Sequence, residues 1–412
     1  MIPHVRLTPG LVLTEHEFSV PLDHSRPDGR QITVFAREVS DPDGLDRPFL
    51  VFFQGGPGHE APRPSRHPTA PGYLDRALAE FRVLMLDQRG TGRSSPVGVL
   101  PGMSPEAQAE YLTHFRADSI VRDAELIRAE LGVERWSVLG QSFGGFCVTT
   151  YLSMAPEGLR EAFITGGLPP IGRQVDDVYA ATYRRVLERN RRYYARYPDD
   201  RDRVLRIHQR LQDHDVRLPS GDRLTPRRSR QLGSLLGASD GAERLHYLVE
   251  LPPESPAFLH DVEASTAFAR NPIYAALHEA CYADGCATRW SAERMLPADY
   301  EAAPELFTGE HVYPWMFSDY GALAPLREAA MLLAEHPWPA LYDAGRLSAN
   351  EVPVAAAVYL EDMYVERQFS EETLALVPGL RGWLTNEYEH NGLRADGARI
   401  LDHLIDLARR GA

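Results

Sequence analysis

Residues 136–145 read Trp-Ser-Val-Leu-Gly-Gln-Ser-Phe-Gly-Gly, and the rest of the chain is organised around this stretch. A short apolar run leads into Gly-x-Ser-x-Gly, and a segment with helical character follows it. A serine in such a turn stands above the end of a strand, because flanking glycines permit the crowded backbone and a helix N-terminus lies beneath. The strand before and the helix after it favour a nucleophilic Ser142 over an ordinary capping serine.

Strand and helix signals alternate on both sides of this turn. Continuous apolar runs at 49–53 and 81–86 are typical of strands buried on both faces. The β-rich segments 11–20 and 31–40 predict an antiparallel hairpin at a sheet edge, and residues 105–131 have helical spacing. This order predicts an α/β fold in which helices cover both faces of a mostly parallel sheet.

The pattern changes in the middle of the chain, where segment 171–345 predicts helix after helix and little strand. Strand signals return afterwards, and a final amphipathic helix is expected at about 394–409. We therefore expect a first part of the sheet domain at 1–170, an inserted, mainly helical cap at 171–345, and a second part of the sheet domain at 346–412.

Composition and charge exclude several classes of function. The chain is 43% hydrophobic and 25% charged, with a formal net charge of −14, which disfavours nucleic acid as a partner. The arginine-dense stretch at 184–230 is interpreted as a solvated helix face, since no nucleic-acid-binding module accompanies it. Three cysteines, Cys147, Cys281 and Cys286, fit a reducing compartment and complete no zinc site. Because neither a signal-peptide pattern nor a membrane-spanning run is present, we expect a cytoplasmic protein without a membrane partner.

A serine nucleophile needs a base, and the base needs a carboxylate to orient it. On this kind of sheet the chain order is serine, then Asp or Glu, then histidine. The first strand signal after the insertion, at 354–359, is followed by Leu-Glu-Asp, so Asp362 is the expected acid and Glu361 its alternative. Among 15 histidines, His390 is selected as the base because it lies between the last strand and the last helix.

Acyl transfer also needs hydrogen-bond donors for the oxyanion of the tetrahedral intermediate. The backbone N–H of Phe143, next to the nucleophile, is one expected donor. The second is expected in the turn after the strand at 49–53, where Gly55 and Gly56 lack a Cβ and let their amides approach a ligand closely.

Three glycine-containing motifs occur together in this chain: Gly-Gly-Pro-Gly at 55–58, Asp-Gln-Arg-Gly-Thr-Gly-Arg-Ser at 87–94 and Gly-Gln-Ser-Phe-Gly-Gly at 140–145. Their combination resembles the proline iminopeptidases (prolyl aminopeptidases), which are serine peptidases of the α/β-hydrolase fold. The resemblance extends to residues 354–364 and 385–394, so it covers both parts of the predicted sheet domain.

The resemblance implies removal of an N-terminal proline from short peptides whose N-terminus is free, without a metal or another cofactor. It also implies that cap carboxylates bind the free imino group of the substrate. Glu279 and Glu310 are the candidates, with Tyr282 and Trp315 as aromatic contacts for the proline ring. One departure is Gln54, where the family commonly has histidine, and this change concerns the geometry of the oxyanion site and not the class of enzyme.

Two other functions stay open. A broader aminopeptidase, an amidase or an esterase uses the same three catalytic groups, because a fold does not determine a substrate. A non-catalytic binding protein on this scaffold is the second alternative, and the complete set of Ser142, Asp362 and His390 argues against it. The sequence predicts no oligomeric state.

Overall fold

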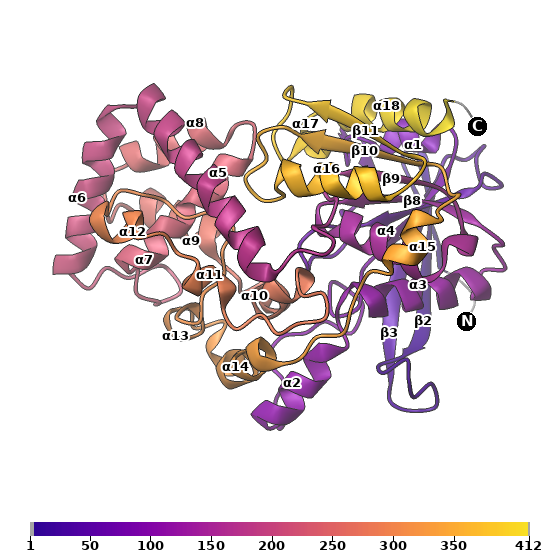
Figure 1. Ribbon diagram of the computed structural model, residues 1–412, viewed down its shortest axis with the longest axis horizontal. Helices are drawn as coiled ribbons and strands as arrows, with labels where there is room; N and C mark the ends of the chain where they lie inside the picture. Colours follow the sequence, from indigo (N-terminus) through magenta and orange to yellow (C-terminus); the bar gives the residue numbers. More distant parts are fainter. Residues whose placement is uncertain (1–3, 411–412) are drawn as a thin grey trace.

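A computed structural model describes residues 4–410, and a single large sheet forms one half of it, to the right in Figure 1. In chain order the strands of this sheet are β1 (His4–Thr8), β2 (Leu11–Pro21), β3 (Gln31–Ser40), β4 (Phe49–Phe53), β7 (Arg82–Leu86), β8 (Trp136–Gln141), β9 (Leu159–Thr165), β10 (Val354–Tyr359) and β11 (Leu380–Thr385). Two further short strands, β5 (Ser65–Arg66) and β6 (Thr69–Ala70), pair only with each other.

The strands lie in the order β1-β2-β3-β7-β4-β8-β9-β10-β11. From β7 to β11 all neighbouring strands are parallel, whereas β1, β2, β3 and β7 pair antiparallel. The predicted hairpin of β2 and β3 is confirmed, with Val12 opposite Ser40. The β1 strand lies outside this hairpin. The mostly parallel sheet is also as predicted.

Helices cover both faces of the sheet (Figure 1). Those that accompany the sheet are α1 (Leu74–Leu78), α2 (Pro105–Thr113), α3 (Ala117–Glu130), α4 (Phe143–Met154), the 3₁₀ turn η1 (Pro156–Gly158), α15 (Ala344–Ser348), α16 (Arg367–Leu376), α17 (Gly392–Ala395) and α18 (Gly397–Arg409). Side chains alternate along β4, so Phe52 packs in the core under α1 and α18 while Phe53 packs in the core under α3 and α4. All five residues of β4 are buried, as expected for a central parallel strand.

Two helix boundaries differ from the prediction. The helix expected over 105–131 is interrupted, and the buried Arg116 at the break donates to the backbone carbonyls of Ala283 and Pro339. Local periodicity does not reveal such a contact with a distant part of the chain. The last helix begins at Gly397, because the chain forms the separate turn α17 first.

Between β9 and β10 the chain is helical. This part contains α5 (Val175–Arg196), α6 (Asp199–Asp213), α7 (Pro226–Ser229), η2 (Arg230–Gly237), α8 (Gly241–Glu250), α9 (Pro256–Thr266), α10 (Pro272–Leu277), η3 (Glu279–Cys281), α11 (Ser291–Arg294), α12 (Asp299–Ala302), α13 (Met316–Asp319), η4 (Ala324–Leu326) and α14 (Arg327–Glu335). Figure 1 shows most of these helices beside the sheet, and several pack around an apolar cluster that includes Leu211, Leu245 and Phe258. For this architecture we propose the division into 1–170, 171–345 and 346–412.

The arginine-dense helix α5 is more than a solvated face. Arg185 donates to both carboxylate oxygens of Glu366 at 2.7 Å, and Glu366 lies at the start of α16. Two further arginines of α5 make ion pairs, Arg189 with Glu389 and Arg192 with Glu361. These pairs join the helical segment to the loops after β10 and β11, which the sequence pattern of α5 alone does not indicate.

Candidate active site

Ser142 lies in the sharp turn between β8 and α4. Its backbone has φ 56° and ψ −125°, a strained conformation for a residue with a side chain. The turn is possible because glycine follows it: a Cβ on Gly144 would lie 2.0 Å from the carbonyl oxygen of Phe53. The Ser142 N–H donates to the carbonyl of Thr165 at 2.9 Å, which attaches the turn to β9. This geometry raises the hydroxyl above the carboxyl end of the parallel strands.

Three predicted catalytic side chains form one hydrogen-bonded series. His390 Nε2 lies 2.9 Å from Ser142 Oγ, and His390 Nδ1 lies 2.6 Å from Asp362 Oδ2. The other carboxylate oxygen of Asp362 accepts the N–H groups of Tyr364 and Val365 at 2.8 and 3.1 Å, so the loop holds the carboxylate in place. The arrangement has the geometry of a nucleophile, a base and an orienting acid.

The electrostatics of His390 suit a general base. Burial lowers the pKa of the imidazole, but the adjacent Asp362 carboxylate more than reverses this effect and the net result is a raised pKa. Glu310 adds to the rise and the Arg394 guanidinium opposes it. A raised pKa makes the His390 imidazole a stronger base.

Glu361, the alternative acid, points elsewhere. Its carboxylate pairs with Arg192 of α5, which holds the pKa of Glu361 below its usual value. Its backbone carbonyl accepts from Arg189 at 2.7 Å. Glu361 therefore joins the loop after β10 to the helical segment, whereas Asp362 is the acid that contacts His390.

The predicted oxyanion donors lie beside the nucleophile. A Cβ on Gly55 would lie 3.0 Å from the Ser142 Cβ, so the backbone of this glycine approaches the serine closely. Gly56 has φ +136°, which a residue with a side chain rarely adopts, and both glycines line the same cavity as Ser142. Phe143 begins α4, and the first N–H groups of a helix have no partner within the helix.

A cavity of about 630 Å³ opens over Ser142 and His390, between the sheet and the helical segment. Its wall includes Gln54, Gly55 and Gly56 from the sheet side and residues of η2, α8, α9 and the loop at 309–312 from the helical segment. Of the described residues that line it, Glu310 is the single acidic one.

The Glu310 carboxylate is held by two partners. It accepts the hydroxyl of Tyr274, and its Oε2 lies 3.8 Å from Nε2 of the buried His278. Tyr179 in turn contacts His278 Nδ1 at 3.3 Å. Burial alone would raise the pKa of Glu310, but His278 and Tyr274 outweigh it and the pKa is lowered. Glu310 therefore stays ionised beside His390, which suits the binding of a cation.

Comparison with known proteins agrees with this geometry. The alpha/beta hydrolase fold family matches residues 48–262. A proline iminopeptidase of Aeromonas sobria is 52% identical, and the match covers 97% of each chain. The proline iminopeptidase aneH of Aspergillus aculeatus is 35% identical over 96% of this chain and 93% of its own. The chain belongs to the proline iminopeptidase family. The resemblance drawn from the three sequence motifs is therefore confirmed, as is the α/β-hydrolase fold.

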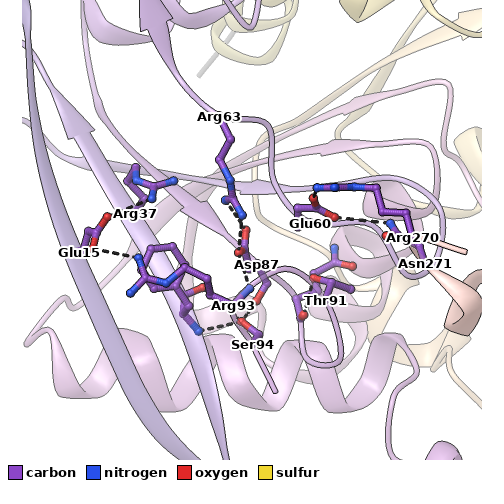
Figure 2. Close-up of polar contacts among 12 residues, drawn as sticks. Glu15, Arg37, Glu60, Arg63, Asp87, Thr91, Arg93, Ser94, Arg270 and Asn271 are labelled. Carbon is purple, nitrogen blue, oxygen red and sulfur yellow. Dashed lines mark hydrogen bonds and ion pairs between the residues drawn. The ribbon is translucent and has the colours of Figure 1, made fainter. Parts of the chain in front are cut away.

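In this proline iminopeptidase-family chain the motif at 87–94 supports the site without lining it. The buried Asp87 pairs with Arg63 at 3.0 Å, and Arg93 pairs with Glu15 of β2 at 2.9 Å. Figure 2 shows how these side chains lie. Glu60, in the same Pro-rich loop as Arg63, pairs with Arg270 of the helical segment (Figure 2). The motif and this loop thus connect the glycine turn at 55–58 to one wall of the cavity.

Three predicted substrate-binding residues do not line the cavity. Glu279 is buried, accepts the Ala292 N–H at 2.8 Å and borders a small separate cavity. Tyr282 packs edge-on against Phe146 in the core. Trp315 stacks on a neighbouring tyrosine, with the Arg227 guanidinium over its ring. Of the two candidate carboxylates, the structure brings only Glu310 to the serine, so the expectation for Glu279 finds no support in this geometry.

Several residues at the site were not predicted. Tyr274 and His278 hold Glu310, and the ring of Tyr364 packs edge-on against His390 with centroids 4.8 Å apart. A signal existed for the first two, since they lie four residues apart on α10 and the residue after it, and this spacing puts both on one helix face. Arg394 follows His390 closely in sequence but carried no recognisable motif.

Residues 4–410 contain neither a metal-binding cluster nor a membrane-spanning helix. No group of three or more His, Cys, Asp or Glu side chains in this range is arranged to hold a metal ion. Within the same range, the helices are too short or too polar to cross a bilayer.

Proposed function

We propose that this chain is a proline iminopeptidase, a serine hydrolase that releases N-terminal proline from short peptides with a free N-terminus. One observation carries the proposal: a single cavity is lined by Ser142, by His390, which is hydrogen-bonded to both Ser142 and the buried Asp362, and by one ionised carboxylate, Glu310. The full-length likeness to proline iminopeptidases supports the same activity.

The first half of the reaction transfers the prolyl group to the serine. His390 Nε2 accepts the proton of Ser142 Oγ as the oxygen attacks the prolyl carbonyl carbon. The N–H of Phe143 and the Gly55–Gly56 turn stabilise the oxyanion that forms. Asp362 keeps the proton on His390 Nδ1 and stabilises the imidazolium. His390 then gives its proton to the departing amine, and the peptide without its proline leaves.

The second half releases proline. A water molecule gives a proton to His390 and attacks the acyl carbon, again with the oxyanion held by the same N–H groups. Collapse of the intermediate returns the proton to Ser142 Oγ and frees the amino acid.

Choice of the N-terminal residue takes place at Glu310. The secondary amine of an N-terminal proline is cationic near neutral pH, and it is costly to bury unpaired. The Glu310 carboxylate pairs with it, since Tyr274 and His278 keep this group ionised and oriented. An acyl group on the proline nitrogen removes the charge and leaves Glu310 without its partner, so N-blocked substrates are poor.

The proposal also includes the kind of partner and the cellular location. The partner is a small peptide and no nucleic acid or membrane is involved, which fits the net charge of −14. The protein acts in the cytoplasm, which suits free cysteines at positions 147, 281 and 286.

The experiment compares prolyl-β-naphthylamide with its N-acetyl derivative and with alanyl and leucyl naphthylamides. We expect the free prolyl substrate to have the highest kcat/KM and the N-acetyl derivative to be at least about tenfold worse, because a charged hydrogen bond contributes about 1.5–3 kcal/mol. Similar rates on all aminoacyl substrates would indicate the broader aminopeptidase. Preference for the N-acetyl compound or for simple esters would contradict the exopeptidase proposal, and failure of a fluorophosphonate to label Ser142 would favour a binding protein.

A further inference from the structure

The charged groups around the cavity are unevenly distributed. Glu310 is the one acidic residue among the described residues that line it, whereas three arginines line it, Arg244, Arg270 and Arg394. The chain as a whole has a net charge of −14, so this concentration of positive charge is local. Glu310 has its role in the proposed function, but no step of the reaction uses the arginines.

One of the three arginines is already neutralised. Arg270 pairs with Glu60, and Asn271 beside it approaches the same carboxylate (Figure 2). In contrast, neither Arg244 nor Arg394 has an ion-pair partner among residues 4–410, and both side chains are exposed. Two guanidinium groups at this cavity therefore have their charge and their N–H donors free for a ligand.

The two free arginines flank one junction between the sheet and the helical segment. The N–H and the hydroxyl of Ser239 both donate to Asn391 Oδ1, at 3.0 and 2.9 Å. Ser239 lies just before α8, which carries Arg244, and Asn391 lies just before α17, which carries Arg394. The charge of Arg394 also reaches the site, because it opposes the rise in the pKa of His390 and adds to the lowering that burial causes in the pKa of His59.

We propose that Arg244 and Arg394 bind a carboxylate on the leaving part of the substrate, the C-terminal carboxylate of a short peptide. This inference rests on the proposed function and adds a substrate class to it: prolyl dipeptides and tripeptides with a free C-terminus. Guanidinium groups match a carboxylate in geometry and charge. The cavity then complements both ends of a zwitterionic peptide, with Glu310 at the amine and the arginines at the carboxylate.

The test compares each free acid with its amide. The substrates are Pro-Gly, Pro-Gly-Gly and Pro-Gly-Gly-Gly, each with a C-terminal carboxylate or carboxamide, and Pro-Glu-amide as a source of a side-chain carboxylate. We expect the wild type to prefer the acid about three- to fivefold at one length, the range of an exposed ion pair, and to lose the preference with added salt. A preference for Pro-Glu-amide over Pro-Gly-amide, without any preference for C-terminal acids, would overturn the assignment to the C-terminus.

Arginine variants test whether Arg244 and Arg394 cause the preference for the free acid over the amide. Arg394→Gln and Arg244→Gln should each bring the acid-to-amide ratio of kcat/KM towards one. Arg206→Gln is the matched control, because Arg206 is an exposed arginine of α6 that lies outside the cavity lining and has no ion-pair partner in the described range. It removes the same charge and should keep the wild-type ratio.

Failure of this inference is distinct from failure of the proposed function. Wild-type turnover of prolyl peptides with equal rates on acids and amides would overturn the role of the arginines and leave the proline iminopeptidase activity intact. An equal loss of preference in all three arginine variants would show an effect of net charge only, which also contradicts the site. No turnover of prolyl-β-naphthylamide, which carries no carboxylate, would instead overturn the proposed function.

Discussion

At the edge of the sheet, Ser142, Asp362 and His390 each follow the carboxyl end of a parallel strand, and they meet because those strands are neighbours or near neighbours. In the helical segment, Glu279 and Glu310 follow no such order. Glu279 is enclosed, and burial raises its pKa to about 7, whereas Glu310 faces the cavity and its pKa is lowered by His278 and Tyr274 despite burial. The sheet places reactive groups by topology, while the helical segment gives two similar carboxylates opposite properties by packing.

The largest effect should come from the sheet side. Ser142→Ala removes the nucleophile, so kcat on prolyl-β-naphthylamide should fall by about five to six orders of magnitude. The control is Ser234→Ala, which lines the same cavity and should stay within about twofold of wild type. Near-wild-type turnover by purified, folded Ser142→Ala would end the serine mechanism.

Two neighbouring acids after β10 sharpen the comparison within the sheet. Asp362→Asn should lower kcat by about three to four orders of magnitude, because the amide no longer favours the correct His390 tautomer. Glu361→Gln, which loses an exposed pair with Arg192, should stay within about threefold of wild type. Steady-state kinetics of both variants decide the matter, and a reversed order would show that Glu361 is the orienting acid.

In the helical segment, the buried Glu279 should make the stability of the protein depend on pH. Because the pKa of Glu279 is raised in the fold to about 7 from an ordinary value near 4.5, its contribution to stability is complete below about pH 4.5 and is lost as the pH rises through 7. The change amounts to at most about 3 kcal/mol.

Urea unfolding at pH 5 and pH 8 measures this effect. The stability of Glu279→Gln relative to wild type should increase with pH over this interval, since glutamine does not titrate. Glu310→Gln should show no such increase, because the pKa of Glu310 is lowered in the fold. Parallel pH curves for wild type and Glu279→Gln would mean that Glu279 is not buried as an acid.

The smallest effect is a shift of a pH profile. Catalysis needs neutral His390, whose pKa is raised by Asp362 and further by Glu310, so activity should fall as the pH drops through a value above 6.5. Glu310→Gln removes one cause of the rise and should move this acid limb to lower pH, while Glu279→Gln should leave it in place. Ester hydrolysis between pH 5 and 8 measures the limb, and an unchanged limb in Glu310→Gln would place Glu310 too far from His390 to act on it.

The sheet side was predictable from sequence because strand order constrains it. A glycine-flanked serine after an apolar run, an acid after the first strand beyond the insertion and a histidine after the last strand identify Ser142, His390 and the adjacent acids Glu361 and Asp362 from order alone. The family motifs extend the same logic to Gly55 and Gly56. The choice between Glu361 and Asp362 required the structure, because two adjacent residues in a loop point to different partners.

The helical segment was less predictable, since its helices are placed by contacts that leave no local pattern. Glu279 and Glu310 both sit among aromatic residues in the sequence, and only the tertiary packing encloses Glu279 and brings Glu310 to the cavity wall. The arginines of α5 are paired with acids that follow β10 and β11, far along the chain. The sequence could not show that Arg394 is unpaired, because an ion pair depends on contacts between distant parts of the chain. The structure shows that Arg394 has no ion-pair partner among residues 4–410.

The most direct test of this division of roles compares Glu310→Gln with Glu279→Gln on two substrates, prolyl-β-naphthylamide and an ester without an amine. We predict that Glu310→Gln lowers kcat/KM for the prolyl substrate at least about tenfold more than for the ester, because it removes one charged hydrogen bond to the substrate amine. Glu279→Gln should show no such difference between the substrates. Equal losses on both substrates for Glu310→Gln, or a selective loss for Glu279→Gln, would contradict the account.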